Sequence, residues 1–300
     1  MSRLSCKSPE LIVDSCLQSW HVIGSGGFGQ IYKARHCKWG CDVAVKLLHY
    51  DDGSSSSLLH EVDMMCQGSS PFILQVLGVF QGRLPPSVLP SPSLSSQLGL
   101  VMEFMERGSL ASLQEALCGA PPWPLAFRLA HQVALGMNFL HSRSPAILHL
   151  DLKPSNVLLD SSLNAKLTDF GLARYSHSVT RASKRKNDDE GGTISYMPPE
   201  AFNISYREDN YTDLYAISSV VRLRISEGDR PPLHVIDRGQ AAGLSNLMQL
   251  MESCWDPTAS QRPSCITVTE GLFDIHKHAI NGAVHRVVLQ LVMMELPDTR

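Results

Sequence analysis

The chain has 300 residues, of which 43% are hydrophobic and 18% charged, and its formal net charge is −3. This length and apolar content predict one large domain, or one domain of two lobes, with an ample core. The 26 basic residues are balanced by 29 acidic ones, which disfavours a nucleic-acid-binding surface. Neither a signal-peptide core nor an apolar run long enough to span a membrane is present, and the eight cysteines have no paired spacing. We therefore expect a cytoplasmic protein with reduced thiols and no zinc.

The first third of the chain has the pattern of antiparallel strands, with β-branched and aromatic residues punctuated by glycine. Strands are predicted within 20–48, at 73–80 and at 98–104. A helix is predicted at 58–67, where apolar residues recur at helical spacing. The segment 81–97 is rich in proline and serine and is expected to be a long exposed loop.

After residue 108 the apolar periodicity becomes that of helices. Helices are predicted at 109–117, 125–142, 211–226, 241–254, 266–278 and 283–295. The segment 175–190 is polar and charged. Strands followed by helices predict an α+β protein with two lobes of different architecture, rather than a doubly wound sheet.

Three glycines with the spacing Gly-x-Gly-x-x-Gly, Gly24, Gly26 and Gly29, lie between two predicted strands. A dinucleotide-binding fold uses the same spacing, but there a helix follows and an acidic residue lies about 20 residues downstream. Here a strand follows and leads to Lys46 in Val-Ala-Val-Lys. Such glycines let the backbone close over phosphates that the lysine pairs with, so the combination favours ATP. A lysine in a buried strand needs a counter-charge, and Glu61 in the predicted helix is the expected one.

The segment 148–160, Leu-His-Leu-Asp-Leu-Lys-Pro-Ser-Asn-Val-Leu-Leu-Asp, has the chemistry of phosphoryl transfer. Asp151 can accept the proton of an incoming hydroxyl, Lys153 can neutralise the transferring phosphoryl group, and the amide oxygen of Asn156 can hold a metal. Asp169, in a later Asp-Phe-Gly triplet, would hold the magnesium that bridges the nucleotide phosphates. Each residue alone has a structural explanation, such as a helix cap or a surface charge. Their order and spacing together predict a catalytic site.

These motifs resemble those of eukaryotic protein kinases over nearly the whole chain, from about residue 20 to 273. Further matching segments are Met-Pro-Pro-Glu at 197–200, Thr-Asp-Leu-Tyr at 212–215, Cys-Trp at 254–255 and Arg-Pro at 262–263. Within that superfamily the chain resembles the receptor-interacting serine/threonine kinases. The resemblance rests on the segments 38–46, 123–125, 148–160, 190–200 and about 281–291, and different segments are similar to different members of the family.

The resemblance implies the bilobal protein-kinase fold. The expected boundaries are an N-terminal flank at 1–18, a kinase domain at 19–275 with its N-lobe at 19–105 and C-lobe at 106–275, and an apolar helical tail at 276–300. ATP and Mg²⁺ would be the cofactors. Protein substrates would be phosphorylated on serine or threonine. Related kinases or adaptor proteins are the expected partners, with a homodimer as one arrangement.

The resemblance also assigns roles to individual residues. Met102 would be the gatekeeper beside the adenine, and the backbone of 103–105 would be the hinge that reads the adenine edge. Asp213 would hold the catalytic loop through backbone amides, and Glu200 would pair with Arg262. The residues expected to contact the nucleotide are Ile23, Gly24, Gly26, Gly27, Gly29, Ile31, Ala44, Lys46, Met102, Glu103, Met105 and Leu158.

Two features depart from the kinase pattern. Leu150 stands where many kinases carry an arginine that clamps a phosphorylated residue, so we expect activity that does not depend on such a clamp. The stretch from Asp213 to Arg230 is shorter than in kinases that align here. The shortening falls after Ala216 and would remove the end of a helix, a loop and most of the next helix, exposing apolar core. A skipped exon, a faulty gene model and an evolved shortening all explain it.

Two functions follow from these observations. The leading one is a serine/threonine kinase that transfers the γ-phosphoryl group of ATP to a protein hydroxyl or to its own activation segment, in the death-receptor or innate-immune signalling that the family implies. The alternative is a catalytically weak scaffold that associates with related kinases. The tail helix at 283–295 supports an interaction role, although packing against the C-lobe also accounts for it. A dehydrogenase is disfavoured because βαβ units are missing.

Overall fold

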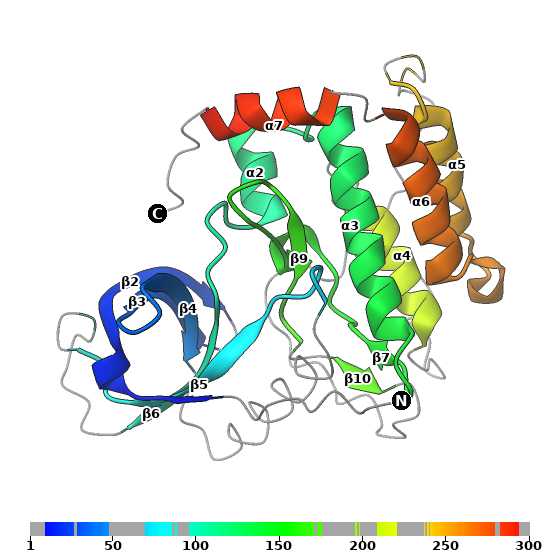
Figure 1. Cartoon of the computed structure of the whole chain (residues 1–300). Helices are drawn as coiled ribbons and strands as arrows, with labels where there is room; N and C mark the ends of the chain where they lie inside the picture. Colours follow the sequence, from blue (N-terminus) through cyan, green and yellow to red (C-terminus); the bar gives the residue numbers. More distant parts are fainter. Residues whose placement is uncertain are drawn as a thin grey trace, which may run out of the picture. The chain divides into compact units, whose positions relative to one another are not determined.

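In the computed structural model the chain forms two compact units, residues 1–106 and residues 107–298. The residues described are 10–26, 29–47, 70–85, 88, 96–170, 173–175, 196, 198, 209–220, 237, 239, 241–279 and 283–293. Figure 1 labels the helices and strands.

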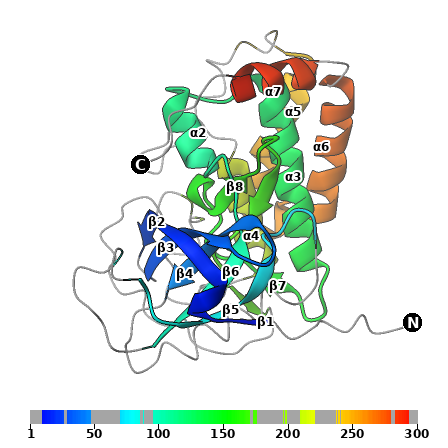
Figure 2. The same cartoon turned by 60° about the vertical axis from the view of Figure 1, so that its left-hand side comes forward.

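The first unit is built on one sheet of six strands in the order β1-β5-β6-β4-β3-β2, visible in Figure 2. Its strands are β1 (Glu10–Ile12), β2 (Leu17–Gly26), β3 (Gly29–His36), β4 (Cys41–Leu47), β5 (Val76–Gly82) and β6 (Gln97–Glu103). All neighbouring pairs are antiparallel except β1 and β5, which are parallel. The predicted strands are confirmed, with β5 and β6 displaced by up to three residues at their ends.

Strand β4 is buried on both of its faces. Because side chains alternate along a strand, Val43, Val45 and Leu47 point to one side and Ala44 and Lys46 to the other. The first set belongs to the hydrophobic core of this unit, together with Ile12, Leu17, Tyr32, Ala34, Phe80, Leu84 and Val101. On the second side Lys46 is only 6% exposed, which is unusual for a charged residue without a functional or ionic role.

Residues that we expected to precede the domain contribute to its sheet. Strand β1 pairs with β5 in parallel, with Glu10 opposite Gly78, and the side chain of Ile12 is 1% exposed in the core. A Cβ atom at position 78 would lie 2.4 Å from the carbonyl oxygen of Glu10. The close approach of β1 therefore requires glycine on β5. No local pattern in the short segment 10–12 indicates that it pairs with β5.

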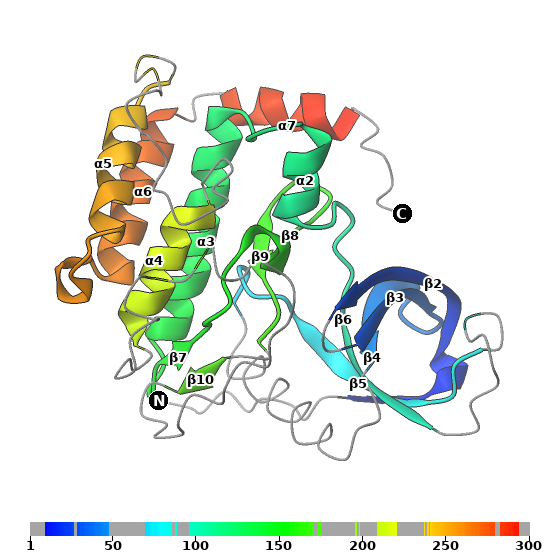
Figure 3. The same cartoon turned by 180° about the vertical axis from the view of Figure 1, so that it is seen from behind.

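The second unit is mainly helical. Its helices are α2 (Leu110–Ala116), α3 (Trp123–His141), α4 (Asn210–Val220), α5 (Leu244–Cys254), α6 (Cys265–Ala279) and α7 (Ala283–Met293). Figure 3 shows α4 and α6 beside α3. Helix α3 also packs against α7 and the short strand β9 (Ala165–Leu167). Helix α3 supplies much of the core because its apolar residues recur every three or four positions; those fully buried include Leu125, Phe127, Leu129, Val133, Met137 and Leu140.

Two short strand pairs complete this unit. Strand β7 (Ile147–Leu148) pairs with β10 (Arg174–Tyr175), and β8 (Val157–Leu159) pairs with β9 (Ala165–Leu167), both antiparallel. Strands β7 and β8 lie at the two ends of the predicted catalytic stretch. Strands β9 and β10 lie before and after the Asp-Phe-Gly segment. The α+β class and the two-part architecture predicted from the sequence are confirmed.

Helix boundaries follow local chemistry. The Ser109 side chain accepts a hydrogen bond from Ser112 N–H at 3.1 Å, and the Ser112 side chain accepts one from Ser109 N–H at 3.0 Å, so α2 begins with a reciprocal cap. Helix α5 begins at Leu244 rather than at 241, because Gly243 has a φ of +85° and cannot continue a helix. The predicted helix at 58–67 and the end of the one at 211–226 lie outside the described residues.

Helix α7 packs against α3 within the second unit. This agrees with one of the two explanations of the apolar tail, packing against the C-lobe. In this helix Leu291 is 6% exposed, and Arg107 Nη2 donates to the carbonyl oxygen of Val292 at 3.3 Å. Leu289, in contrast, is 44% exposed, so the helix does not bury every apolar side chain. None of the helices that the structure describes is long and apolar enough to cross a membrane.

Candidate active site

The predicted catalytic stretch is a loop between two short strands of the second unit. Strand β7 ends at Leu148, β8 begins at Val157, and a 3-10 turn at Pro154–Asn156 lies between them. Proline suits the first position of the turn because its φ is already helical and its missing amide would have no partner there. The turn closes with a hydrogen bond of 2.9 Å from Asn156 N–H to the carbonyl oxygen of Lys153.

This turn brings Asp151, Lys153 and Asn156 together. Asn156 Nδ2 donates to Asp151 Oδ2 at 2.9 Å and to the Asp151 carbonyl oxygen at 2.8 Å, and Lys153 Nζ lies 3.2 Å from Asp151 Oδ2. Asp151 is 8% exposed and Asn156 5%. The protein, rather than bulk water, therefore fixes the direction of the carboxylate.

The two predicted metal ligands, Asn156 and Asp169, belong to connected segments. Thr168 N–H donates to the carbonyl oxygen of Asn156 at 3.0 Å, and Asp169 follows directly. Because Asn156 Nδ2 donates to Asp151, the amide oxygen of Asn156 is directed away from that carboxylate. An amide oxygen and a carboxylate are the hard oxygen ligands that Mg²⁺ takes, with phosphate oxygens and waters filling the remaining positions. The donor set fits this ion.

A buried histidine also connects the loop to the Asp169 segment. His149 Nε2 donates to the carbonyl oxygen of Thr168 at 3.0 Å, and its Nδ1 accepts a hydrogen bond from Asp151 N–H at 3.3 Å. The ring packs against Phe170, with centroids 5.0 Å apart. No role was predicted for His149 from the sequence, although its position two residues before Asp151 was the available signal.

Asp213, on α4, holds the catalytic loop as the resemblance implied. Its Oδ2 accepts from His149 N–H at 2.8 Å and its Oδ1 from Leu150 N–H at 2.8 Å, and Oδ2 also lies 2.9 Å from His141 Nε2. Burial acts to raise the pKa of Asp213, but the hydrogen bonds from His141 and Leu150 and the electrostatic influence of His141 and His149 outweigh it, and the pKa lies below its usual value. The buried group is therefore an ionised acceptor for three donors.

Leu150 is held in a conformation that leucine rarely adopts. Its φ is +64°, in the left-handed region, which costs a residue with a Cβ atom roughly 1–2 kcal/mol. The hydrogen bond from its amide to Asp213 and its burial at 8% exposure maintain this conformation. Leu150 thus places a buried apolar side chain where a phosphate-clamping arginine would place a charge.

In the first unit the predicted nucleotide-binding residues share one face of the sheet. Ile31 is opposite Lys46 and Ala44 is opposite Met102 in adjacent antiparallel strands, and directly opposite residues lie on the same side. Ala44 is the smallest of these four side chains. Glu61, the predicted partner of Lys46, lies outside the described residues.

The predicted glycine segment spans the end of the β2–β3 hairpin. Ile23 and Gly24 lie in β2, where Ile23 is 40% exposed. Gly26, the last residue of β2, pairs with Gly29, the first residue of β3. Gly27 lies outside the described residues. A strand, β3, follows the glycine segment as predicted, rather than the helix of a dinucleotide fold.

The predicted hinge follows β6. Glu103 N–H donates to the carbonyl oxygen of Gln75 at 3.1 Å, and Gln75 N–H donates to Glu103 Oε1 at 2.8 Å. These bonds fix the chain just before Met105, which is 6% exposed. Leu158, predicted to line the same adenine pocket, lies in β8 of the second unit, so the predicted nucleotide contacts are divided between the two units.

Arg262 is buried at 3% exposure. Its Nε donates to the carbonyl oxygen of Asp256 at 3.0 Å and Nη1 to that of Tyr211 at 3.1 Å, and the guanidinium lies 5.3 Å from the centre of the Tyr215 ring. The structure thus shows Arg262 connecting the start of α4 to the segment after α5. Its predicted partner Glu200 lies outside the described residues.

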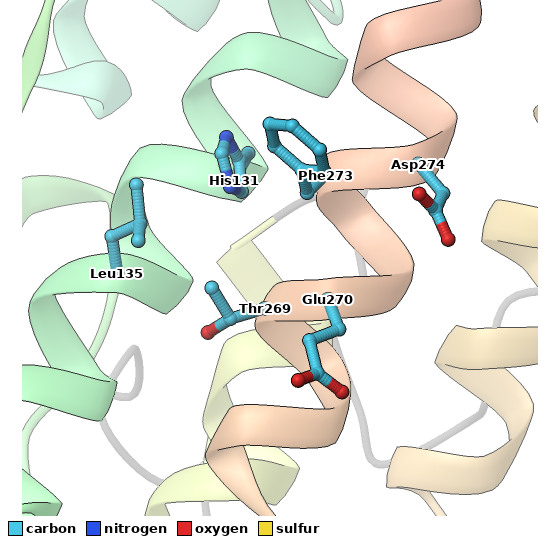
Figure 4. Close-up of a pocket in the computed structure, with 6 residues that line it drawn as sticks. All are labelled: His131, Leu135, Thr269, Glu270, Phe273 and Asp274. Carbon is cyan, nitrogen blue, oxygen red and sulfur yellow. The ribbon is translucent and has the colours of Figure 1, made fainter.

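A cavity of about 620 Å³ lies between α3 and α6, and none of the predicted site residues lines it. Its lining residues, drawn in Figure 4, are His131, Leu135, Thr269, Glu270, Phe273 and Asp274. Beside it, the ring of His276 lies 5.5 Å from that of His131. Burial, followed by the nearby His131 and Arg128, lowers the pKa of His276 to about 4, and its Nδ1 is buried without a hydrogen-bond partner.

His276 makes stability sensitive to mild acid. Its pKa is lower in the folded chain than in the unfolded one, so the unfolded chain binds more protons between pH 6.5 and about 4. We expect the midpoint of thermal unfolding to fall across this range and His276→Asn to reduce the fall. The exposed His21→Gln is the matched control. Equal pH dependence in the wild type and His276→Asn would contradict this assignment.

Comparison with known proteins agrees with this geometry. The chain matches the family model of the protein kinase domain over residues 17–278, and it therefore belongs to the protein kinase family. It is also similar to several receptor-interacting serine/threonine-protein kinases, so the more specific resemblance predicted from the sequence is confirmed.

Three of these relatives show the extent of the similarity. Receptor-interacting serine/threonine-protein kinase 4 of Mus musculus is 36% identical over 280 residues, covering 85% of this chain and 33% of that protein. Kinase 3 of Homo sapiens is 34% identical over 296 residues, with coverage of 90% and 54%. Kinase 2 of Bos taurus is 32% identical over 283 residues, with coverage of 83% and 49%. The chain thus spans between a third and about half of the length of these relatives.

Proposed function

We propose that this chain is a serine/threonine protein kinase that transfers the γ-phosphoryl group of ATP to protein hydroxyls, including its own. The observation that carries the proposal is the cluster of Asp151, Lys153 and Asn156, hydrogen-bonded into one loop and connected through Thr168 to Asp169. These four side chains have the chemistry that phosphoryl transfer requires: a base, a cation and two oxygen ligands for metal.

Asp151 would orient the acceptor hydroxyl and accept its proton. Two features support this role: Asn156 and Lys153 fix the carboxylate, and little of the side chain is exposed. Lys153 would place its ammonium group beside the transferring phosphoryl group and reduce the repulsion between that group and Asp151. The main contribution of this loop is therefore positioning and electrostatic stabilisation rather than covalent chemistry.

Asn156 and Asp169 would hold magnesium, which supplies charge neutralisation on the nucleotide phosphates. In the first unit, Lys46 would pair with the phosphate oxygens and be oriented by Glu61, while the backbone of Gly24, Gly26, Gly27 and Gly29 would close over them. The apolar contacts to the adenine would come from Ile23, Ile31, Ala44, Met102 and Leu158. The backbone of Glu103 and Met105 would provide the hinge hydrogen bonds.

The names of the relatives support serine/threonine specificity and a place in receptor-linked signalling. We propose a cytoplasmic protein that phosphorylates protein substrates in death-receptor or innate-immune signalling. Related kinases or adaptor proteins, or a second copy of the chain, would be its partners. The exposed Leu289 on α7 is one apolar position available to such a partner.

A catalytically weak scaffold is the second candidate. The observation that favours it is the short stretch between Asp213 and Arg230, because Asp213 on α4 holds the catalytic loop. A shortening that begins just after Ala216 would weaken the support of that helix. The catalytic side chains are present in either case, so activity itself must be measured.

The deciding experiment is transfer of radiolabelled phosphate from ATP by the purified chain, with and without Mg²⁺. We expect incorporation into serine and threonine, and we expect Asp169→Asn to reduce it to background because one metal ligand is lost. Equal incorporation by both proteins would discard the kinase proposal. A thermal shift with Mg-ATP but no transfer would support the scaffold.

A further inference from the structure

Three buried side chains from three helices form a hydrogen-bonded series that ends at the catalytic loop. Cys265 Sγ, on α6, lies 3.1 Å from His141 Nδ1, at the end of α3. His141 Nε2 lies 2.9 Å from Asp213 Oδ2, on α4. Cys265 is 4% exposed, and the side chains of His141 and Asp213 are 6% and 1% exposed. Water therefore has little access to any member of the series.

One proton arrangement makes the thiol the donor in this series. Asp213 is ionised and can only accept, so His141 Nε2 must carry a proton. Burial, with the nearby Asp213 and Cys254, raises the pKa of the Cys265 thiol above its ordinary value, so the sulfur carries its proton. With its proton directed at Nδ1, the thiol can donate S–H to that nitrogen, which then holds a lone pair.

This arrangement opposes two influences that favour a charged ring. His141 lies at the C-terminal end of α3, where the helix dipole favours a cation, and it is hydrogen-bonded to the Asp213 carboxylate. A second proton would have to occupy Nδ1, the atom that faces Cys265. With the thiol as the donor, the ring is neutral and its proton lies on Nε2. Besides His141, His149 is the titratable group that acts on the Asp213 carboxylate.

We propose that Cys265 is a positioning residue for the phosphoryl transfer proposed above, acting through the tautomer of His141 and the carboxylate of Asp213. A neutral ring donates one hydrogen bond to Oδ2 and leaves the negative charge of Asp213 available to the amides of His149 and Leu150. An imidazolium would draw the carboxylate toward itself and weaken those two bonds. The amide positions immediately before Asp151 would then be less well fixed.

Cys254 provides a matched control for packing. It is a second buried cysteine, 2% exposed, on α5, and burial, the largest of several influences, raises its pKa to about 12. Truncating either cysteine to alanine removes one buried thiol of the same size. Of these two cysteines, Cys265 is the one with a described hydrogen bond to His141, so an effect confined to Cys265 reports the hydrogen bond and not the cavity.

The first test is independent of activity: long-range proton–nitrogen NMR of the full chain labelled with ¹⁵N-histidine, near neutral pH. The His141 signal is assigned by its absence from His141→Gln. We expect Nδ1 of His141 to be unprotonated in the wild type and in Cys254→Ala, and protonated in Cys265→Ala. Cys265→Ser keeps a donor and should keep Nδ1 unprotonated. A protonated Nδ1 in the wild type, or an unchanged signal in Cys265→Ala, would overturn the proposal.

The second test follows phosphate transfer by the same variants. We expect Cys265→Ala to lower kcat by about threefold to tenfold with the KM for ATP unchanged, since one net hydrogen bond to the loop support is weakened. Cys265→Ser should restore most of kcat. Equal losses in Cys265→Ala and Cys254→Ala, without rescue by serine, would reduce Cys265 to a packing residue. If no variant transfers phosphate, the kinase proposal fails while the NMR result still decides the hydrogen-bond series.

Discussion

Asp213→Asn is expected to destabilise the second unit by about 3 kcal/mol and to lower phosphate transfer by about 100-fold. The carboxylate accepts from two backbone amides and from His141 while only 1% exposed. An asparagine of the same shape turns an NH₂ group toward at least one of these donors, leaving buried donors unpaired. The loop that carries Asp151 would lose its fixed position even where the chain remains folded. Urea unfolding gives the free-energy change, and initial rates of transfer give the activity.

Asp209→Asn is the control for this variant. Asp209 is exposed just before α4 and accepts from Tyr211 and Thr212 N–H, a helix-capping role that asparagine performs about equally well. We expect it to change the free energy of unfolding by less than about 0.5 kcal/mol. An equally small effect of Asp213→Asn would show that the catalytic loop does not depend on this carboxylate.

The acid dependence of Asp213 has a defined direction. Its pKa is lowered in the folded chain, so its contribution is complete above its ordinary value of 3.8 and is lost as the pH falls below that value. The His276 contribution, in contrast, is lost at higher pH, between 6.5 and about 4. Mild acid and strong acid therefore test different parts of the second unit.

Asp151→Asn is expected to lower kcat by about 1,000-fold while the chain remains folded and binds Mg-ATP. The amide has no basic oxygen to take the acceptor hydroxyl's proton, but it can still accept from Asn156 Nδ2, which donates to Asp151 at 2.9 Å. The KM for ATP should change little, because the predicted nucleotide contacts are made by other residues. Initial rates over a range of ATP concentrations separate the two effects.

Glu252→Gln, an exposed carboxylate on α5, removes one negative charge elsewhere in the same unit and should leave kcat unchanged. Retention of kcat within about tenfold in Asp151→Asn, with ATP binding intact, would show that a general base at this position is not needed. That result would direct attention to positioning alone as the source of catalysis.

Local patterns in the sequence were sufficient for strands β2 to β6, for helices α2 to α7 and for the catalytic loop. The alternation in β4 places Val43 and Val45 on one side and Lys46 on the other, a consequence of a period of two that needs no tertiary information. The spacing of Asp151, Lys153 and Asn156 specifies a tight turn, and the structure brings these side chains together. Ser109 begins α2 through a cap that lies within four residues. Interactions between residues a few positions apart can therefore be predicted from the local sequence.

Apart from the role of Asp213, which the family resemblance implied, the sequence did not indicate the features that depend on contacts between distant segments. Strand β1 gains its place only because β5 carries Gly78, which admits a backbone at close range. His141 and Cys265 had no assigned role, since each is an ordinary residue near a helix end until α3, α4 and α6 pack together. The chemistry of phosphoryl transfer was therefore readable from short spacings. The support of the catalytic loop, through Asp213, His141 and Cys265, was decided by packing, because hydrogen bonds between separate helices leave no periodic signal in any one of them.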